Sequence, residues 1–254
     1  MNIKEFDYLF DLNGYYILKN VIDLDDIKKA NDILKKIEKK KSSELPNNVF
    51  FGKKKNSREI YISNILEINK IFEKIGSLSI FLKLIKRVTG NSNFFRLNHA
   101  VGMTKLKKDA YTYLHMGNLP HHPKVFYFVK NGLIFSNVTK ILVPLCNNKI
   151  NDGGFAVVPG SHKSNFVRPY DNNPKNNLSC LKHLEVNPGD AVIFTEALAH
   201  GSMINKSNKI RRVLSYMYSV KYMPDWGKFN LKYSEKYLNN SSKKIKKLIK
   251  VQKK

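Results

Sequence analysis

Cysteine and long apolar runs are both scarce in this sequence. The chain of 254 residues has two cysteines, Cys146 and Cys180, which are too few for a disulfide scaffold and lack the spacing of a metal-binding cysteine cluster. No run approaches the roughly 18 consecutive apolar residues of a membrane span. The polar residues 1–5 do not have the pattern of a signal peptide. Together these absences predict a protein of the reducing cytoplasm.

Acidic residues are scarce as well, with 20 Asp and Glu against 45 Lys and Arg, a formal net charge of +25. Such a charge is typical of proteins that bind nucleic acid or anionic membrane. However, most of the excess is lysine in a chain that is also rich in Asn and Ile, a bias that an AT-rich genome produces without selection for function. The final basic run, residues 243–254, is expected to form a short amphipathic helix or a solvated tail. The charge therefore gives no strong evidence for a nucleic-acid or membrane partner, and a role of the tail at anionic lipid or RNA stays an alternative.

The distribution of apolar residues predicts one domain that is mainly β with flanking helices. A length of 254 residues is typical of a single β-sandwich or barrel. In the middle of the chain, short apolar runs alternate with Gly, Pro and Asn clusters, as in a jelly-roll or double-stranded β-helix. Before them, helical spacing predicts one helix from the N-cap Asp23 to about residue 41 and a second over residues 65–88, broken near Gly76.

The single domain, residues 1–254, divides into three segments on this basis. Residues 1–92 are expected to form an N-terminal strand and helical support, with the helices packed on one face of the sheet. Residues 93–222 should form the double-stranded β-helix core, which is a jelly-roll or cupin-like arrangement. Residues 223–254 are expected to be a basic C-terminal tail.

The segment from Asn187 to Tyr218 holds the two residues that point most directly to chemistry. A tight turn at residues 187–190 leads into the apolar strand 191–194, and a second turn cluster leads into an alternating strand that begins at Arg211. His200 and Arg211 are therefore expected on neighbouring antiparallel strands. Imidazole is the commonest ligand of first-row metals, and a guanidinium can bind a carboxylate through two hydrogen bonds. The two residues suit a metal and an anionic co-substrate.

Three stretches in the chain carry a family resemblance. They are Phe10-Asp11-Leu12-Asn13-Gly14-Tyr15-Tyr16-Ile17-Leu18, then Asp152-Gly153-Gly154-Phe155-Ala156-Val157-Val158-Pro159-Gly160-Ser161-His162-Lys163, and finally His200-Gly201-Ser202 ahead of Arg211. With these motifs the chain resembles, over most of its length, the phytanoyl-CoA dioxygenase family of iron(II)- and 2-oxoglutarate-dependent oxygenases. In that family the first stretch is an opening strand and the second ends in a PGSHK signature. The resemblance implies Fe(II) as cofactor, and 2-oxoglutarate and dioxygen as co-substrates.

The resemblance also implies roles for four residues. His115 and His200 match the proximal and distal iron ligands, and Arg211 and Ser202 match residues that hold 2-oxoglutarate. In the family the proximal histidine belongs to a His-x-Asp pair, whereas this chain has Gly117 in place of the aspartate. Two histidines and one carboxylate hold one face of Fe(II) and leave three positions for the 2-oxo acid and dioxygen. The departure at Gly117 therefore concerns the chemistry and not the fold.

Three interpretations of the missing carboxylate follow, in this order of preference. In the first, Glu196 is a relocated third ligand, with Asp109 and Asp152 as weaker candidates. The protein would then hydroxylate a C–H bond of a small-molecule or acyl substrate and decarboxylate 2-oxoglutarate to succinate. In the second, chloride binds beside Gly117, as in the related iron halogenases, which have glycine or alanine there. In the third, the protein is a non-catalytic jelly-roll binding protein.

Other polar and aromatic residues are expected to be structural. Arg212 should face away from Arg211 by strand alternation, as a solvated surface cation. His162 should order its own turn, and the remaining histidines carry no metal-binding pattern: His99, His121, His122 and His183. Most of the aromatic residues with strand-like spacing should lie in the core: Tyr111, Tyr113, Tyr127 and Phe128.

Overall fold

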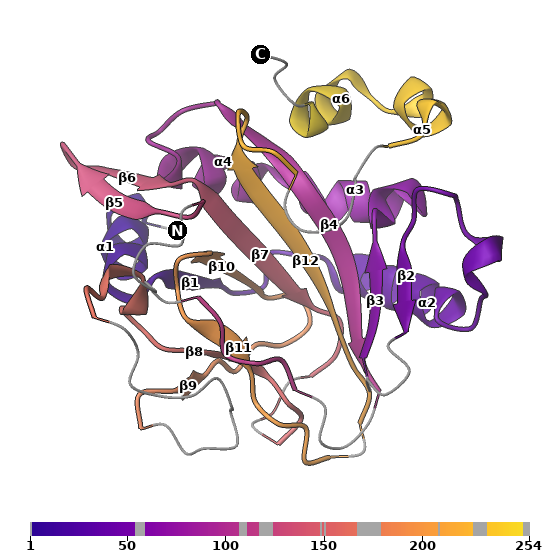
Figure 1. The fold of residues 1–254 in the computed structure, drawn as a ribbon, viewed down its shortest axis with the longest axis horizontal. Coiled ribbons are helices and arrows are strands. Elements are labelled where there is room, and N and C mark those ends of the chain that lie inside the picture. The colour runs from indigo at the N-terminus through magenta and orange to yellow at the C-terminus, as the bar shows by residue number, and fades with distance from the viewer. Residues whose placement is uncertain are drawn as a thin grey trace.

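The fold consists of two facing β-sheets with helices on the outer side of the larger one (Figure 1). The computed structural model describes residues 2–53, 59–106, 111–116, 124–147, 149, 151–166, 179–207, 209–225 and 233–250. The two sheets show the double-stranded β-helix that the sequence predicts, mainly β with flanking helices. Within the described residues, no helix is both long enough and apolar enough to span a membrane.

The larger sheet has seven strands in the order β1-β10-β7-β12-β4-β3-β2, and every neighbouring pair is antiparallel. A three-stranded sheet, β11-β8-β9, faces it, and β5 and β6 form a separate hairpin. The strands of the large sheet are β1 (Tyr15–Leu18), β2 (Phe51–Lys53), β3 (Glu59–Ser63), β4 (Phe95–Lys105), β7 (Val138–Pro144), β10 (Ala191–Thr195) and β12 (Arg211–Val220). The others are β5 (Tyr127–Lys130), β6 (Leu133–Ser136), β8 (Phe155–Val157), β9 (Lys182–His183) and β11 (His200–Ser202).

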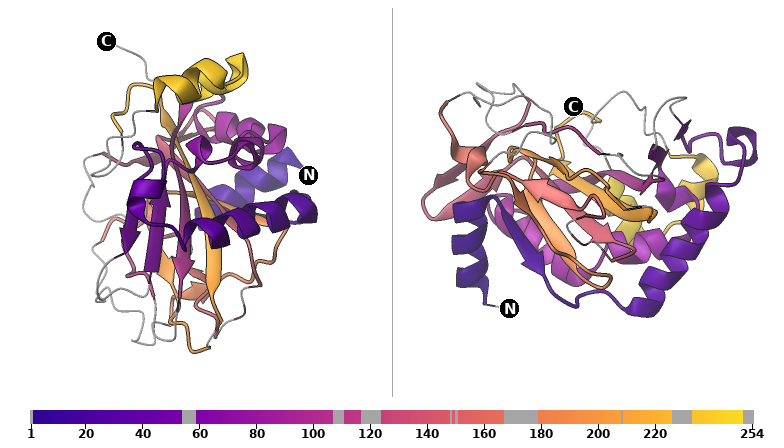
Figure 2. Two further views of the ribbon diagram at one scale, coloured as in Figure 1. Left: turned by 90° about the vertical axis from the view of Figure 1, so that its right-hand side faces the viewer. Right: turned by 90° about the horizontal axis from the view of Figure 1, so that it is seen from below.

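The helices gather on one side of the large sheet, as the turned views show (Figure 2). They are α1 (Ile3–Asn13), α2 (Leu24–Ile37), α3 (Lys70–Gly76), α4 (Ser79–Val88), α5 (Glu235–Asn240) and α6 (Lys243–Ile249), with short 3-10 turns at Ser42–Glu44, Ile65–Glu67 and Ser161–Lys163. The predicted N-cap of α2 is confirmed, because the Asp23 carboxylate accepts a hydrogen bond from the backbone N–H of Asp25. The predicted break near Gly76 is confirmed as well, since α3 ends there.

The first motif of the family resemblance is only partly a strand. Of residues 10–18, β1 takes Tyr15–Leu18, whereas Phe10 belongs to α1. Phe6 and Phe10 lie one turn apart and are both fully buried, so residues 3–13 form an amphipathic helix. Gly14 ends this helix in the left-handed conformation, with φ of 81°, and donates its N–H to the Phe10 carbonyl, a common C-terminal cap. The helix therefore replaces the first half of the expected strand.

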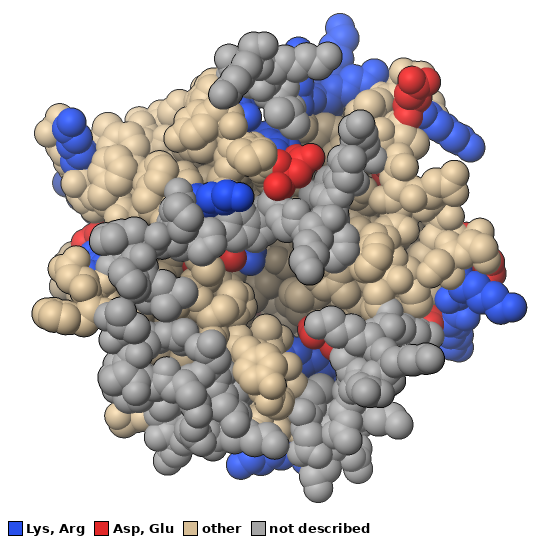
Figure 3. All heavy atoms as spheres, in the orientation of Figure 1, with Lys and Arg blue, Asp and Glu red and all other residues tan. Residues whose placement is uncertain are grey.

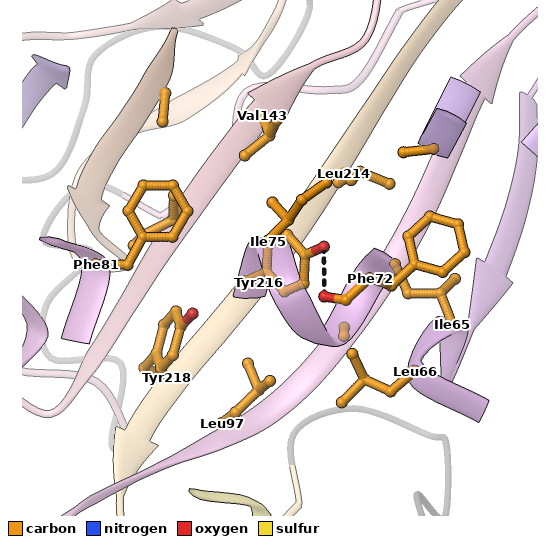
Figure 4. Close-up of a cluster of buried hydrophobic side chains, with 14 of the residues drawn as sticks. Ile65, Leu66, Phe72, Ile75, Phe81, Leu97, Val143, Leu214, Tyr216 and Tyr218 are labelled. Atoms are coloured by element: carbon orange, nitrogen blue, oxygen red, sulfur yellow. Dashed lines mark hydrogen bonds between the residues drawn. The ribbon is translucent and has the colours of Figure 1, made fainter. Parts of the chain in front are cut away.

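Alternation along β12 divides the protein into a packed side and a hollow side. The even-numbered residues of β12 face the helices, where Leu214, Tyr216 and Tyr218 are fully buried. The Tyr216 hydroxyl donates a hydrogen bond of 3.0 Å to the Phe72 carbonyl of α3 (Figure 4), which satisfies a polar group in an otherwise apolar core. The odd-numbered residues face the smaller sheet and line a cavity.

Arg212 also faces the helices, and the prediction of a solvated cation is wrong. The alternation itself holds, but α2 covers that face of the strand. The Arg212 guanidinium donates to both carboxylate oxygens of Glu38, Nε at 2.7 Å and a terminal nitrogen at 2.6 Å. Thr104 donates to the same carboxylate at 2.5 Å. Both charged side chains are largely buried, so this pair ties the end of α2 to the strand that carries Arg211.

The prediction that the strand-like aromatic residues lie in the core is wrong for the exposed ones. Tyr113 and Phe128 are exposed, and Tyr111 and Tyr127 are half-buried. For Tyr127 and Phe128 the reason is that β5 pairs with β6 alone among the described strands, so one face of this hairpin has no partner sheet. Tyr111 and Tyr113 lie outside the strands, on the segment beside β11.

The basic C-terminal segment forms α5 and α6, at the top of Figure 1. The apolar residues of α6 are buried against the body of the protein: Ile245, Leu248 and Ile249. This face is therefore used within the fold, and the amphipathic pattern does not indicate a lipid-binding helix. Over the face shown in Figure 3, Lys and Arg side chains are scattered and interspersed with Asp and Glu, which agrees with a charge spread along the sequence.

Candidate active site

A cavity of about 320 Å³ lies between the two sheets. Successive inward-facing residues of the large sheet form its wall, because every second side chain of a strand points to the same face. They are Glu59 and Tyr61 of β3, His99, Val101, Met103 and Lys105 of β4, Lys140 and Leu142 of β7, and Arg211, Val213, Ser215 and Met217 of β12. The opposite wall includes Phe155 of β8, residues 200–202 of β11, and Thr112 and His115 from the segment beside β11.

His115 and His200 are paired through the backbone. Each donates its N–H to the carbonyl of the other at 3.0 Å, and the ring centroids lie 4.1 Å apart. Nδ1 of His115 lies 2.8 Å from the Tyr113 carbonyl, and Nδ1 of His200 lies 2.7 Å from the Leu198 carbonyl. A carbonyl can only accept, so each Nδ1 carries the proton and each Nε2 keeps a lone pair. Burial, and then the neighbouring His115, holds the pKa of His200 well below its usual value.

Glu196 completes a group of three possible metal ligands. The ligand atoms of His115, Glu196 and His200 lie within 4.8 Å of one another, and Glu196 Oε2 is 3.8 Å from His200 Nε2. The carboxylate is almost fully buried, and the Lys140 ammonium lies 2.8 Å from Oε1 and 2.7 Å from Oε2. Two imidazole lone pairs and one carboxylate suit a first-row divalent metal such as iron. The donor set therefore fits a metal ion.

The end of the cavity at Arg211 is built for an anion. Arg211 is buried, and its Nε finds no hydrogen-bond partner among the described residues. Lys105, directly opposite Arg211 in the sheet, donates to the hydroxyl oxygens of Thr112, at 2.8 Å, and Ser202. Burial, and then the neighbouring Arg211, lowers the pKa of Lys105 to about 7, and burial lowers the pKa of Arg211 to about 10. The Glu59 carboxylate also lines this end and opposes both shifts. Two desolvated cations against one carboxylate still favour a bound anion.

Ser202 contributes to the same end. Its hydroxyl oxygen accepts from the Thr112 N–H at 2.8 Å and from Lys105. A serine oxygen has two acceptor sites and one hydrogen. Because both acceptor sites are used, the hydrogen remains for an acceptor in the cavity.

A family model agrees with this geometry. The model of phytanoyl-CoA dioxygenase (PhyH) matches residues 10–213. The chain belongs to the phytanoyl-CoA dioxygenase family. This PhyH protein is thus a non-haem iron, 2-oxoglutarate-dependent enzyme, as the family resemblance implied. No curated protein matches the chain in sequence.

Solved structures of similar fold cover nearly the whole PhyH protein. HygX from Streptomyces hygroscopicus, with nickel, 2-oxoglutarate and hygromycin B bound, is similar at 19% identity and a TM-score of 0.75, over 89% of this chain and 90% of that one. The epimerase SnoN from nogalamycin biosynthesis has 14% identity and a TM-score of 0.64, over 87% and 83%. AviO1 from Streptomyces viridochromogenes Tue57 has 16% identity and a TM-score of 0.63, over 88% and 97%. At these identities the similarity shows the fold.

Four of the predicted site residues of the PhyH protein share the cavity, but not in the expected arrangement. His115, His200, Ser202 and Arg211 all line it. His200 and Arg211 were expected on neighbouring strands, and this prediction is wrong: β11 pairs with β8, whereas β12 lies between β7 and β4. The connection between them crosses from one sheet to the other, so the two side chains line the cavity from opposite walls.

The other candidate ligands do not join the group. Asp152 is buried apart from it, where its carboxylate accepts the Lys149 N–H at 3.2 Å. His162 lies outside the group as well, and its Nε2, 3.0 Å from the Asp11 carbonyl, joins its turn to α1. The remaining sequence candidates lie outside the described residues: Asp109, Gly117, His121 and His122.

Several polar residues of the cavity wall were not expected from the sequence, among them two lysines and a histidine. Lys105 and His99 share the inward face of β4 with Val101 and Met103, and Lys140 shares that of β7 with Leu142. Alternation could have placed all three inside. A lysine on an apolar strand face is a rare pattern, because lysine is almost never fully buried unless paired, and that rarity was the available signal. His99 is buried, which lowers its pKa to about 3 and keeps the imidazole neutral.

Proposed function

We propose that this protein is an Fe(II)- and 2-oxoglutarate-dependent oxygenase that hydroxylates a C–H bond of a small-molecule or acyl substrate. In this proposal His115, His200 and Glu196 hold the metal. The observation that carries it is the three-ligand group, whose two histidines line the cavity, together with a separate anion site in the same cavity that has two cationic side chains. A metal that must bind a 2-oxo acid needs both.

The anion site would hold the distal carboxylate of 2-oxoglutarate. Arg211 has an unused buried donor, Lys105 a second positive charge, and Ser202 an unused hydroxyl hydrogen. Together they can bind a carboxylate through charge-assisted hydrogen bonds, which are roughly twice as strong as neutral ones. With that end held, the 2-oxo acid end is directed toward the histidines.

The chemistry consumes one dioxygen and one 2-oxoglutarate, and releases succinate and carbon dioxide while a C–H bond becomes C–OH. Bound Fe(II) supplies the redox chemistry that activates dioxygen in this reaction. The protein's own part is to orient 2-oxoglutarate, to keep both ligand imidazoles neutral through their Nδ1 hydrogen bonds, and to shield the site from water with the apolar residues Val213, Leu142 and Phe194.

The substrate would enter at the other end of the cavity. Six residues along β12 separate Arg211 from Met217, a span of about 20 Å. Near that end lie Tyr61 and the neutral His99, whose polar atoms are 3.4 Å apart. The small-molecule ligands named for HygX and SnoN, hygromycin B and nogalamycin RO, support a small-molecule substrate here.

Glu196 favours this proposal over the two alternatives. A carboxylate that already lies with the two histidines makes a chloride ion unnecessary as third ligand, so a chloride-dependent halogenase ranks second. A non-catalytic binding protein ranks third, because such a protein would have no need for a site that combines metal ligands and an anion pocket.

The test is anaerobic titration of the protein with Fe(II) and 2-oxoglutarate, followed by the visible charge-transfer band of the chelate. We expect a band in the wild type, its loss in His115→Ala and His200→Ala, and its retention in His183→Ala, a histidine of β9 outside the cavity. A weakened band in Glu196→Ala supports Glu196 as ligand. A band that is unchanged in Glu196→Ala but shifts when chloride is added would favour the halogenase. The absence of a band in the wild type would favour the binding protein.

A further inference from the structure

A partly buried lysine beside the proposed metal ligands has no role in the function described so far. Lys140 lies in β7 on the inward face, next to Leu142. Its side chain is 18% exposed, and that of Glu196 is 2% exposed. The ammonium lies 2.8 Å from one carboxylate oxygen of Glu196 and 2.7 Å from the other. Within the described part of the chain, Glu196 is the carboxylate that forms an ion pair with it.

We infer that Lys140 is a positioning residue that sets the charge of the metal centre, because a metal ion must share the Glu196 carboxylate with the Lys140 ammonium. The inference rests on the proposed function, since it takes Glu196 as a metal ligand. The shared atom is Oε2, which lies 2.7 Å from Lys140 Nζ and 3.8 Å from His200 Nε2. Lys140 therefore contacts the same oxygen that faces the histidine pair.

The consequence follows from counting charges. Two neutral imidazoles and one carboxylate carry −1, so a divalent ion bound to them leaves +1. With the Lys140 ammonium included, the empty site carries 0 and the loaded site +2. Coulomb interactions between charges a few ångströms apart are strong in a buried site. Lys140 should thus weaken the binding of the metal alone and strengthen the subsequent binding of 2-oxoglutarate, a dianion.

These two effects have opposite signs, which separates them from structural damage. A variant that merely distorts the cavity weakens the binding of both metal and 2-oxoglutarate. Removal of the Lys140 charge, in contrast, should tighten the binding of the metal and weaken the binding of 2-oxoglutarate. Removal of the Glu196 charge should do the reverse.

The experiment uses the full chain and two anaerobic titrations. The first measures the dissociation constant of Co(II) alone by its visible absorption, and the second that of 2-oxoglutarate for the Mn(II)-loaded protein by calorimetry. The variants are Lys140→Met, which has a similar length without charge, Glu196→Gln, and the double variant. Lys130→Met is the matched control, because Lys130 is an exposed lysine on the β5–β6 hairpin. His200→Ala reports whether Co(II) occupies the proposed site at all.

For Lys140→Met we expect Co(II) to bind at least about tenfold more tightly and 2-oxoglutarate at least about tenfold more weakly. Glu196→Gln should shift both constants in the opposite directions, the double variant should return toward the wild type, and Lys130→Met should change neither. If the affinities for Co(II) and for 2-oxoglutarate change in the same direction in Lys140→Met, or do not change, the inference is overturned while the proposed function stands. If Co(II) does not bind to the wild type, or binds equally to His200→Ala, the proposed function itself fails and the inference fails with it.

Discussion

The affinity for 2-oxoglutarate should depend on the protonation of Lys105. In the free protein, burial and the neighbouring Arg211 lower the pKa of this lysine to about 7, from an ordinary value near 10.4. About half of the Lys105 side chains are then charged at pH 7, and about one in a hundred at pH 9. A bound carboxylate favours the ammonium form. Binding of 2-oxoglutarate above pH 7 should therefore take up a proton.

The magnitude follows from linkage between proton and ligand binding. Each pH unit above the pKa of the free protein costs about 1.4 kcal/mol of binding free energy, or a factor of about ten. Half of the lysine is already charged at pH 7, so the affinity should fall about fifty-fold between pH 7 and pH 9. Lys105→Met should bind 2-oxoglutarate weakly and with nearly the same affinity at both values.

The assay is calorimetric titration of the Mn(II)-loaded protein with 2-oxoglutarate from pH 6.5 to 9, in two buffers with different ionisation enthalpies. The difference between the buffers gives the number of protons taken up, which should approach one at pH 9 in the wild type and zero in Lys105→Met. Thermal unfolding of the variant checks that it is folded. The reasoning is refuted if wild-type affinity does not change with pH, or if Lys105→Met keeps the same dependence.

Three further predictions concern the support of the site. Arg212→Met leaves the buried Glu38 carboxylate unpaired, so the free energy of unfolding should fall by about 3 kcal/mol and the midpoint of thermal unfolding by roughly 6–12 °C. The double variant Arg212→Met, Glu38→Leu should be more stable than Arg212→Met alone; if it is not, the pair is not buried as described. Gly201→Ala places a Cβ 2.8 Å from the Thr112 carbonyl oxygen and should displace the His115 segment, so Co(II) affinity should fall about tenfold, and an unchanged affinity would contradict this. Phe81→Ala should lower the free energy of unfolding by about 3–5 kcal/mol, as measured with denaturant. It should not change the affinity for Co(II), because Phe81 packs on the helical side of the large sheet; a loss of Co(II) affinity along with stability would contradict the independence of the core from the site.

Local patterns predicted the parts of the fold that depend on local interactions. The α2 helix begins where Asp23 can cap it, and the turn at residues 187–190 leads into β10 as expected. The region before β1 was mispredicted, although Phe6 and Phe10 have helical spacing. There the expectation followed the family resemblance, while the capping residues Asn2 and Gly14 favour a helix on physical grounds.

Pairing between distant strands could not be predicted in the same way. The turn cluster before Arg211 has the composition of a hairpin, but the chain passes there from the small sheet to the large one. A local pattern specifies a strand and its two faces, and does not specify its partner. The same limit applies to Glu196, whose distance from His115 depends on how β11 pairs. Arg212 shows the complementary case, since its face was predicted correctly and its burial depends on α2.

The backbone pairing of His115 with His200 has a consequence for how such a site can change over time. The two residues are paired by reciprocal main-chain hydrogen bonds, which do not depend on the side chain of either histidine or of a third ligand. A substitution that removes the carboxylate of a His-x-Asp pair thus leaves the two-histidine arrangement in place. If the two histidines bind the metal as proposed, a carboxylate from another part of the chain, such as Glu196, can join them without any change in that backbone pairing.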